Sequence, residues 1–402
     1  MKRLRERLYE RVLKAHLAEL RQMAFLSGPR QVGKSTLGRT VADAVLNWDH
    51  ADDRRLILSG PAAIATHLRL DRLGERRCVL VLDELHKFPR WKTLLKGFFD
   101  VWEERVRIVV TGSSRLDVFR RGGDSLMGRY FLFRIHPFSV GEIATVTPPA
   151  EDAVVRQPSA IPERDFQALW TFGGFPEPFV ERAQAFSRRW RRMRRQQLVR
   201  EDIRDLTRVQ ELDQFETMFR ILEERSGSQL RYNALAADVQ VSVDTARRWI
   251  ATLQTFHAGF LVRPWYRNIA RSLRKEPKWY LHDWSAIENE GARFETMVAC
   301  HLLKAAQAWT DLGLGDFELR YLRDKEQREV DFVVIRDGRP WFLVEAKTAD
   351  GRPSPALSYF LELTGAAHAF QVVLDSPYVA ADCFRHRGPI VVPARTFLSQ
   401  LP

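Results

Sequence analysis

The chain has 402 residues, 45% of them hydrophobic, and is therefore long enough for several domains with buried cores. A formal charge of +12 at pH 7 favours a polyanionic partner, with nucleic acid first and an anionic membrane surface second. The 3 cysteines are widely separated, which excludes a disulfide framework or a zinc site and predicts a reducing, cytoplasmic location.

The first predicted element is a basic helix from Met1 to Leu20. An amphipathic targeting sequence has a similar pattern, but Glu6, Glu10 and Glu19 favour a helix that packs on the following domain. No apolar run reaches the roughly 18 residues that span a bilayer, so no membrane segment is expected.

A phosphate-binding loop is the most specific motif. Gly28 to Ser35 fits G-x-x-x-x-G-K-[ST] at every fixed position and precedes a predicted helix from Thr36 to Leu46. Lys34 is expected to reach the β- and γ-phosphates of ATP, and the Ser35 hydroxyl to ligate Mg²⁺. The alternative is a glycine turn that only opens a helix. The residues expected to bind the nucleotide here are Gly28, Pro29, Arg30, Gln31, Val32, Gly33, Lys34, Ser35 and Thr36.

An unbroken apolar run from Cys78 to Leu82 ends in Asp83 and Glu84. Such a run suits a central parallel strand, whose carboxyl end is where open α/β sheets bind ligands. Asp83 is expected to hold Mg²⁺ through its water shell, and Glu84 to orient the attacking water. The alternative is an acidic pair on the surface.

Two further residues are candidates for the nucleotide site. Ser113 follows the predicted strand from Val106 to Val110 and is expected to sense the γ-phosphate, unless the hydroxyls there cap the next helix. Arg129 precedes another predicted strand. It is either an arginine finger that acts on a neighbouring subunit's nucleotide or a plain surface arginine.

Residues 146–212 are predicted to form a linker and a helical lid. In the lid, the segment from Ser187 to Arg200 places Trp190 and Met193 on one helix face and a fan of arginines on the other. So many like charges repel one another without an anion nearby. The arginines are expected to contact DNA phosphates or the nucleotide, and the alternative is a solvated face.

Residues 213–282 predict a winged-helix-like domain. Three amphipathic helices are followed by a wing that starts at residues 258–262, and Ser242 is expected to cap the third helix. Arg247 and Arg248 of that helix are candidate DNA contacts. The alternative is a domain that serves only as a protein spacer.

A hairpin with embedded charges is predicted in residues 283–402. Asp331 lies on one apolar strand, Glu345 and Lys347 on the next, and Glu295 on the helix before them. Two carboxylates on adjacent strands are suited to Mg²⁺ or Mn²⁺, and the lysine to the charge that develops at a phosphate. A solvent-facing Glu/Lys ladder is the alternative, but charges in apolar strands are costly without a cation.

The E-x-K spacing alone has little specificity, because about one chance match is expected in a chain of this length. Glu276-Pro277-Lys278 also matches and is interpreted as such a chance match, since it has no partner aspartate on an apolar strand. Glu329 and His282 are interpreted as surface or structural residues.

Eight motifs in their order resemble a prokaryotic family of AAA-type ATP-binding proteins with a C-terminal domain of unknown function. They are Gly-Pro-Arg-Gln-Val-Gly-Lys-Ser (28–35), Asn-Trp-Asp (47–49), Leu-Asp-Glu (82–84), Thr-Gly-Ser-Ser (111–114), Gly-Arg-Tyr (128–130), Pro-Phe-Ser (137–139), Gly-Gly-Phe-Pro-Glu (173–177) and Arg-Glu-Asp-Ile (200–203). The C-terminal hairpin resembles the PD-(D/E)xK nuclease core, in which Glu295 matches the first acidic residue. Val330 departs from that pattern, because a proline precedes the aspartate there.

The predicted fold is α/β, with an AAA-type P-loop ATPase core on a parallel sheet (1–145), a linker and helical lid (146–212), a winged-helix-like domain (213–282) and an α/β PD-(D/E)xK nuclease-like domain (283–402). The predicted function is ATP-dependent DNA processing, with Mg²⁺-dependent ATP hydrolysis and metal-dependent DNA cleavage. The alternatives are an ATP-switched DNA-binding or regulatory module without nuclease activity, and a signalling ATPase with a protein partner. The resemblance and Arg129 imply a homo-oligomer. DNA preference, strand polarity, subunit number and pathway do not follow from the sequence.

Overall fold

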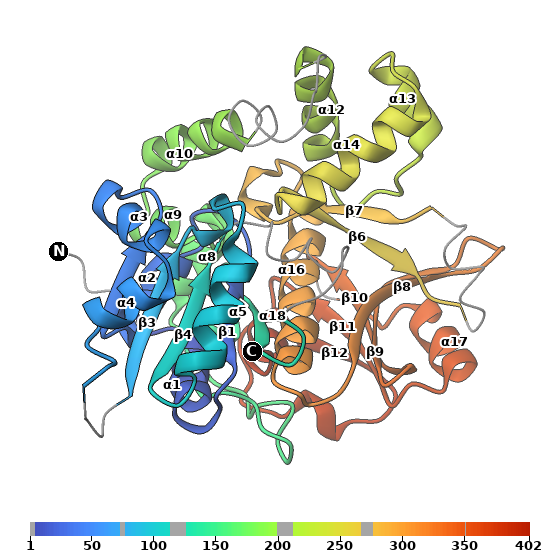
Figure 1. The fold of residues 1–402 in the computed structure, drawn as a ribbon. Helices are drawn as coiled ribbons and strands as arrows, with labels where there is room; N and C mark the ends of the chain where they lie inside the picture. Colours follow the sequence, from blue (N-terminus) through green and yellow to red (C-terminus); the bar gives the residue numbers. More distant parts are fainter. Residues whose placement is uncertain (1–4, 73–76, 113–125, 199–211, 267–275, 350) are drawn as a thin grey trace. The chain divides into compact units, whose positions relative to one another are not determined.

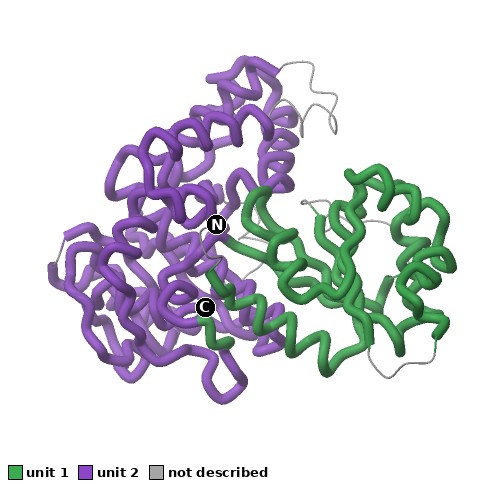
Figure 2. Tube along the Cα trace, turned by 90° about the vertical axis from the view of Figure 1, so that its left-hand side faces the viewer, with its two compact units in different colours: residues 1–136, 146–148 green, residues 137–145, 149–402 purple. Residues whose placement is uncertain are grey.

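In the computed structural model of the chain, residues 5–72, 77–112, 126–198, 212–266, 276–349 and 351–402 are described. The chain divides into two compact units, residues 1–136 with 146–148 and residues 137–145 with 149–402 (Figure 2). The predicted boundaries at residues 145, 212 and 282 stay predictions. Within the described ranges, no helix combines the length and the apolar character that crossing a bilayer requires.

The first unit is built on a five-stranded sheet in which every neighbouring pair is parallel, as the sequence predicts (Figure 1). The strand order is β2-β3-β4-β1-β5. Every residue of β1 and β4 is buried, which is typical of parallel strands covered on both faces. The strands are β1 (Met23–Ser27), β2 (Ala44–Asn47), β3 (Cys78–Asp83), β4 (Val106–Thr111) and β5 (Tyr130–Arg134).

The helices of this unit are α1 (Leu8–Glu19), α2 (Lys34–Val41), α3 (Ala51–Leu58), α4 (Pro61–His67), η1 (Leu85–Lys87) and α5 (Trp91–Trp102). The expected packing of the first helix is confirmed. Arg7, just before α1, is buried and donates hydrogen bonds to Val32 O at 2.9 Å and His136 O at 2.7 Å. Because these acceptors are distant in sequence, they tie the helix to the core.

The predicted helix over residues 36–46 is wrong at its carboxyl end. Helix α2 ends at Val41, and Ala44 begins strand β2, which pairs with β3 through Ala44–Leu80 and Leu46–Leu82. Pairing with a buried strand satisfies the backbone of residues 44–47 and buries Leu46, so tertiary pairing overrides the local helical pattern.

The second unit contains a seven-stranded mixed sheet of order β12-β11-β10-β9-β8-β6-β7. The predicted hairpin is confirmed: β9 and β10 are antiparallel and are joined at Asp337 and Gly338, both with positive φ, as a tight hairpin turn requires. The strands are β6 (Gly259–Pro264), β7 (Lys278–Leu281), β8 (Phe317–Arg323), β9 (Glu329–Arg336), β10 (Arg339–Lys347), β11 (His368–Val373) and β12 (Pro389–Pro393).

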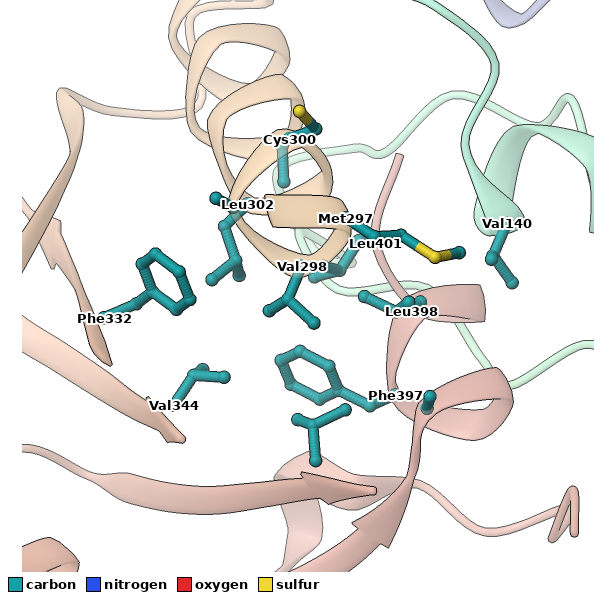
Figure 3. Close-up of a cluster of buried hydrophobic side chains, with 14 of the residues drawn as sticks. Val140, Met297, Val298, Cys300, Leu302, Phe332, Val344, Phe397, Leu398 and Leu401 are labelled. Atoms are coloured by element: carbon teal, nitrogen blue, oxygen red, sulfur yellow. The ribbon is translucent and has the colours of Figure 1, made fainter. Parts of the chain in front are cut away.

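Both faces of this hairpin are covered. Val298 and Leu302 of α16 (Glu290–Asp311) share a buried cluster with Phe332 and Val344 of the hairpin (Figure 3). The alternate hairpin residue Val333 instead packs in a cluster with α17 (Pro355–Thr364). Because Glu295 lies three residues before Val298, this packing also fixes the helix face that carries Glu295.

The remaining helices of the unit are α7 (Val140–Ala144), α8 (Glu163–Phe172), α9 (Pro176–Glu181), α10 (Gln184–Gln197), α12 (Leu212–Glu224), α13 (Tyr232–Asp238), α14 (Val243–Thr255), η3 (Trp284–Ala286), η4 (Cys383–Arg385) and α18 (Ala394–Ser399). The order α12-α13-α14-β6-β7 is that expected of a winged helix. Ser242 caps α14 as predicted, because its hydroxyl accepts a hydrogen bond from Thr245 N at 3.1 Å. Strand β6 also pairs with β8, so the strands of the expected wing extend the C-terminal sheet.

The arginines of α10 do not form the expected exposed fan. Arg194 lies 4.1 Å from the ring centroid of Phe175, and Arg195 pairs with Glu223 at 2.6 Å. Arg191 donates to Ser285 O, whereas Met193, expected inside, is 41% exposed. An aromatic ring, a carboxylate and a backbone carbonyl from other segments therefore bind three of the arginines of α10. The exposed arginines of the helix are Arg188, Arg189 and Arg192.

The buried His301 predicts a pH dependence of stability. Its Nδ1 lies 2.7 Å from Met297 O and its Nε2 lies 2.9 Å from Val140 N, so the neutral ring donates at Nδ1 and accepts at Nε2. Burial lowers the pKa of His301 from 6.5 to about 4. The stabilisation is therefore complete above the unfolded pKa and is lost as the pH falls toward the folded pKa.

Between pH 7 and pH 5, we expect His301 to lower the free energy of unfolding by about 2 kcal/mol. Urea denaturation at both pH values measures this loss. The control is His301→Gln, which keeps an acceptor for Val140 N but does not titrate, and it should lose less stability than the parent. An equal loss in both proteins would contradict the prediction.

Candidate functional site

The phosphate-binding loop joins β1 to α2. Gly28 has φ +138° and a Cβ there would lie 2.1 Å from Ile135 O, so no side chain fits. Gly33 has φ +93° and is the N-cap of α2, which a residue with a side chain would adopt only under strain. The loop geometry therefore depends on both glycines of the motif, and their bare backbone is what close approach of a phosphate requires.

Two side chains at the start of α2 bind this loop and the neighbouring strand β3. The Lys34 ammonium is buried and donates to Gly28 O at 2.8 Å and Pro29 O at 2.7 Å. The Ser35 hydroxyl donates to Asp83 Oδ1 at 2.8 Å. The ammonium and the hydroxyl therefore lie at the helix N-terminus, where the helix dipole favours anions.

The Asp83 carboxylate lies at the carboxyl end of β3 and accepts hydrogen bonds from three side chains, two on neighbouring strands and one on α2. Thr111, at the end of β4, donates to Oδ1, as does Ser35. Asn47, at the end of β2, donates to Oδ2 at 3.3 Å. This donor set and carboxylate fit a Mg²⁺–nucleotide, with Ser35 and Asp83 as the residues that would hold the ion.

Glu84 follows Asp83 in an unusual backbone conformation. Its φ of +56° is in the left-handed region, which costs a non-glycine residue about 1 kcal/mol or more. The conformation turns the chain after β3, and the carboxylate lies 3.2 Å from Lys87 Nζ. Lys87 also binds Asp49 at 2.6 Å. The ion pair with Lys87 thus holds the Glu84 carboxylate near the carboxyl end of β3, next to Asp83 in the chain.

The other predicted nucleotide-site residues differ in exposure. Val32 is fully buried, Gln31 adopts φ +61°, and Arg30 and Thr36 are exposed. Ser113 lies outside the described residues. Their assignment to the nucleotide stays a prediction.

Arg129 forms a bidentate pair with Asp100 of α5, with Nε–Oδ1 at 2.7 Å and Nη2–Oδ2 at 3.1 Å. An arginine finger has to extend toward a neighbouring subunit, so Arg129 would first have to leave Asp100. Its predicted role in catalysis stays a prediction.

A second group of charges surrounds Lys278 on β7. We call Glu295, Glu329, Asp331 and Glu345 the carboxylate cluster. The Lys278 ammonium lies 3.0 Å from Glu295 Oε1, 2.6 Å from Glu329 Oε1 and 3.6 Å from Asp331 Oδ1. Its side chain is only 5% exposed, so these carboxylates replace the water that an ammonium normally binds.

The two hairpin carboxylates have different partners. Asp331 Oδ2 accepts a hydrogen bond from Ala346 N at 3.0 Å, which fixes its orientation toward β10. Glu345 Oε1 lies 2.8 Å from Lys347 Nζ, whereas Glu345 Oε2 is buried without a hydrogen-bond partner. An orphaned buried carboxylate oxygen fits a cation there. Across the described ranges, however, no group of three His, Cys, Asp or Glu side chains is arranged to hold a metal ion.

The pKa values reflect this crowding. Burial raises the pKa of Glu295 to about 7, Asp331 adds to the rise, and Lys278 opposes it. Burial and then Asp331 also raise the pKa of Glu345. Burial disfavours the charge on Lys278, but Glu295, Asp331 and Glu329 outweigh it and raise its pKa above the usual value. Lysine and carboxylates thus stabilise each other's charged forms.

The structure brings Glu295, Asp331, Glu345 and Lys347 together, but the chance-match interpretation of Lys278 was wrong about its surroundings. Lys278 lies on a buried strand in contact with Asp331. The signal that could have revealed this is that Lys278 begins an apolar run. Such a run predicts a buried strand, and a buried ammonium needs a charged partner. Two more participants were missed: Glu329, and Tyr280, whose hydroxyl donates to Glu295 at 2.6 Å.

Several solved structures have low similarity to this chain. C. elegans PCH-2 is 18% identical with a TM-score of 0.23, covering 34% of this chain and 40% of that chain. AMPPCP-bound DnaA from Aquifex aeolicus is 12% identical with a TM-score of 0.29, covering 62% and 87%. Drosophila ORC bound to AT-rich DNA and Cdc6 is 10% identical with a TM-score of 0.25, covering 68% and 86%. Nothing about this chain follows from TM-scores of this size.

Sequence comparisons are more specific. Uncharacterized proteins of Mycobacterium bovis and Mycobacterium tuberculosis are each 23% identical over 336 residues, which covers 79% of this chain and 69% of theirs. Residues 163–288 match the domain of unknown function DUF8612. Residues 20–144 match an AAA domain, and residues 290–381 match the domain of unknown function DUF4143. The chain therefore contains an AAA-type ATPase domain, followed by a C-terminal DUF4143 domain.

Proposed function

We propose that this chain is an ATP-dependent DNA-processing protein in which an AAA-type ATPase works with a metal-dependent, nuclease-like centre. The observation that carries the proposal is the convergence of Asp331, Glu345 and Lys347 beside Glu295, on a hairpin whose strands are apolar in their central parts. Such a set of charges is costly to bury unless it binds something.

In the ATPase half, Lys34 would bind the β- and γ-phosphates, and Ser35 and Asp83 would hold Mg²⁺. Glu84 would accept the proton of the attacking water. The hydrogen bonds that orient Asp83 support this assignment, because they order the carboxylate before any ligand arrives.

In the nuclease-like half, Asp331 and Glu345 would hold Mg²⁺ or Mn²⁺. A bound ion would supply an activated water and a Lewis acid. Lys347 is 48% exposed at its side chain, so its ammonium is accessible to a phosphate while it still contacts Glu345. Glu295 would hold the neighbouring charges in place from α16.

DNA is the proposed partner of this centre. Support comes from the net charge of +12 and from the exposed arginines, which include Arg192 on α10 and Arg247 and Arg248 on α14. The proposal includes a homo-oligomer in the cytoplasm, with Arg129 completing a neighbouring nucleotide site.

A cleavage assay tests the nuclease half. We expect linear, single-stranded or branched DNA to be cut with Mg²⁺ or Mn²⁺, and Asp331→Ala to lower the rate at least about a hundredfold because it removes a metal ligand. Glu318→Ala is the matched control, since Glu318 is an exposed carboxylate on β8 that pairs with Arg320, two residues along the same strand. It should retain activity.

Repeating the assay with Lys34→Ala shows whether cleavage depends on ATP. Equal cleavage by the parent and by Asp331→Ala would indicate a contaminating nuclease and would count against the proposed centre.

One observation favours a second candidate, an ATP-switched DNA-binding or regulatory module without cleavage. The Lys278 ammonium already lies among three of the carboxylates, and the described residues provide no three-ligand metal group. ATP-dependent DNA binding with intact DNA under every metal condition would favour this candidate.

A further inference from the structure

The carboxylate cluster already contains a cation that belongs to the chain. Lys278 is anchored on β7, which pairs with β6 at Val262 and forms a bridge with Gln229. Its ammonium is buried and also lies 5.7 Å from the ring centroid of Tyr321. A lysine fixed by strand pairing and burial stays in place, unlike an exposed lysine on a flexible stem.

The acceptors of the cluster divide into two halves. In the inner half, Glu295 Oε1 accepts from Lys278 and from Tyr280, and Glu329 binds Lys278 through Oε1 and Arg323 through Oε2 at 2.6 Å. The chain's own donors therefore occupy these two carboxylates.

The outer half is less occupied. Asp331 Oδ1 is 3.6 Å from Lys278, which is longer than a good charge-assisted hydrogen bond. Glu345 Oε2 has no hydrogen-bond partner. Asp331 and Glu345 thus have coordinating capacity left.

The charge balance of the cluster also leaves room for one further cation. When ionised, the four carboxylates of the cluster face three cations, Lys278, Lys347 and Arg323, which leaves a charge of −1. One divalent ion on the outer half would more than neutralise this excess. A second ion beside Lys278 would place like charges together at close range.

We propose that Lys278 is a positioning residue that takes the place of a second metal ion, so that the cluster binds a single divalent cation on Asp331 and Glu345. This inference rests on the proposed function of the same site. Mg²⁺ is commonly bound by one or two carboxylates, with water and substrate phosphate as the other ligands, and the outer half provides two carboxylates. Two-metal centres instead hold their ions about 3.5–4 Å apart, and here the inner carboxylates are already bound to the ammonium.

Counting bound Mn²⁺ on the nucleotide-free full chain tests the inference by calorimetry and by electron paramagnetic resonance. Asp331→Asn measures binding outside the cluster, including the phosphate loop. We expect the parent to bind about one more Mn²⁺ than Asp331→Asn. Lys278→Met should bind about two more, because the inner carboxylates become available. Lys278→Arg keeps the charge and should bind the same number as the parent.

A readout of stability accompanies the count. Lys278→Met leaves three carboxylates without their counter-ion, so its melting temperature should fall without metal and rise more steeply with Mn²⁺ than that of the parent. If Lys278→Met does not fold, the double variant Lys278→Met/Glu329→Gln removes one of the repelling charges and should show the same gain of an ion.

The results separate the two proposals. Suppose that the parent binds one ion in the cluster and that neither Lys278→Met nor Lys278→Met/Glu329→Gln binds a second. The proposed role of Lys278 is then wrong, while the proposed metal site survives. If the parent and Asp331→Asn bind equally, the proposed nuclease centre fails. A new ion in Lys278→Met would in that case still support Lys278 as the occupant of a cation position.

Discussion

Glu84→Gln is expected to lower the turnover of ATP by about 10² to 10⁴-fold while ATP binding is retained, because glutamine keeps the shape of the side chain but cannot accept a proton. The left-handed backbone at Glu84 and the neighbouring Asp83 place the carboxylate at the carboxyl end of β3, where a water that attacks the γ-phosphate would lie. Phosphate release measures turnover, and titration with a non-hydrolysable analogue measures binding.

Two variants make this result specific. Lys34→Ala should lose binding as well as turnover, because the ammonium contributes to the ground state. Lys87→Met removes the ion pair with Glu84 but keeps the carboxylate, so its turnover should stay within about tenfold of the parent. Parent-like turnover in Glu84→Gln would identify Glu84 as a surface carboxylate.

Lys304→Met should destabilise the second unit by about 3–5 kcal/mol, because it leaves a buried carboxylate without its counter-ion. Lys304 on α16 binds Glu142 Oε2 at 2.5 Å and Ser139 Oγ at 2.9 Å. The two side chains are 2% and 0% exposed. Urea denaturation, followed by circular dichroism, measures the loss.

The exposed pair Lys14–Glu10 provides the control. It has a similar N–O distance of 2.7 Å, but Lys14 is 58% exposed at its side chain. Lys14→Met should therefore cost less than about 1 kcal/mol. The double variant Lys304→Met/Glu142→Gln should recover part of the loss, since it removes the unpaired charge. A loss in Lys304→Met no larger than in Lys14→Met would show that burial does not strengthen the pair.

Prediction from sequence was most successful where a structural element is encoded by neighbouring residues. The phosphate-binding loop, the carboxylates at the end of β3 and the β9–β10 hairpin each occupy a short stretch, so spacing and apolar runs were enough to locate them. Prediction failed at the end of α2, where residues 44–46 of the expected helix instead belong to strand β2, which pairs with β3.

The arginines of α10 show the same limitation on a helix. A charge pattern indicates which residues share a face, but it does not indicate which partners reach that face. Phe175 precedes α9 and Glu223 lies on α12, and these two residues contact Arg194 and Arg195. The exposure of the α10 arginines therefore depends on how other segments pack against the helix, which the sequence of one helix cannot specify.

By itself, the sequence determined that the chain carries a phosphate-binding loop and a hairpin with embedded charges, because local motifs and strand periodicity are encoded by residues close together along the chain. Only the tertiary structure decided that Lys278 belongs with Asp331. That contact exists because β6 pairs with both β7 and β8, which adds a distant strand to the sheet that carries the hairpin. Once water is excluded there, a lysine and the carboxylates must compensate one another's charge.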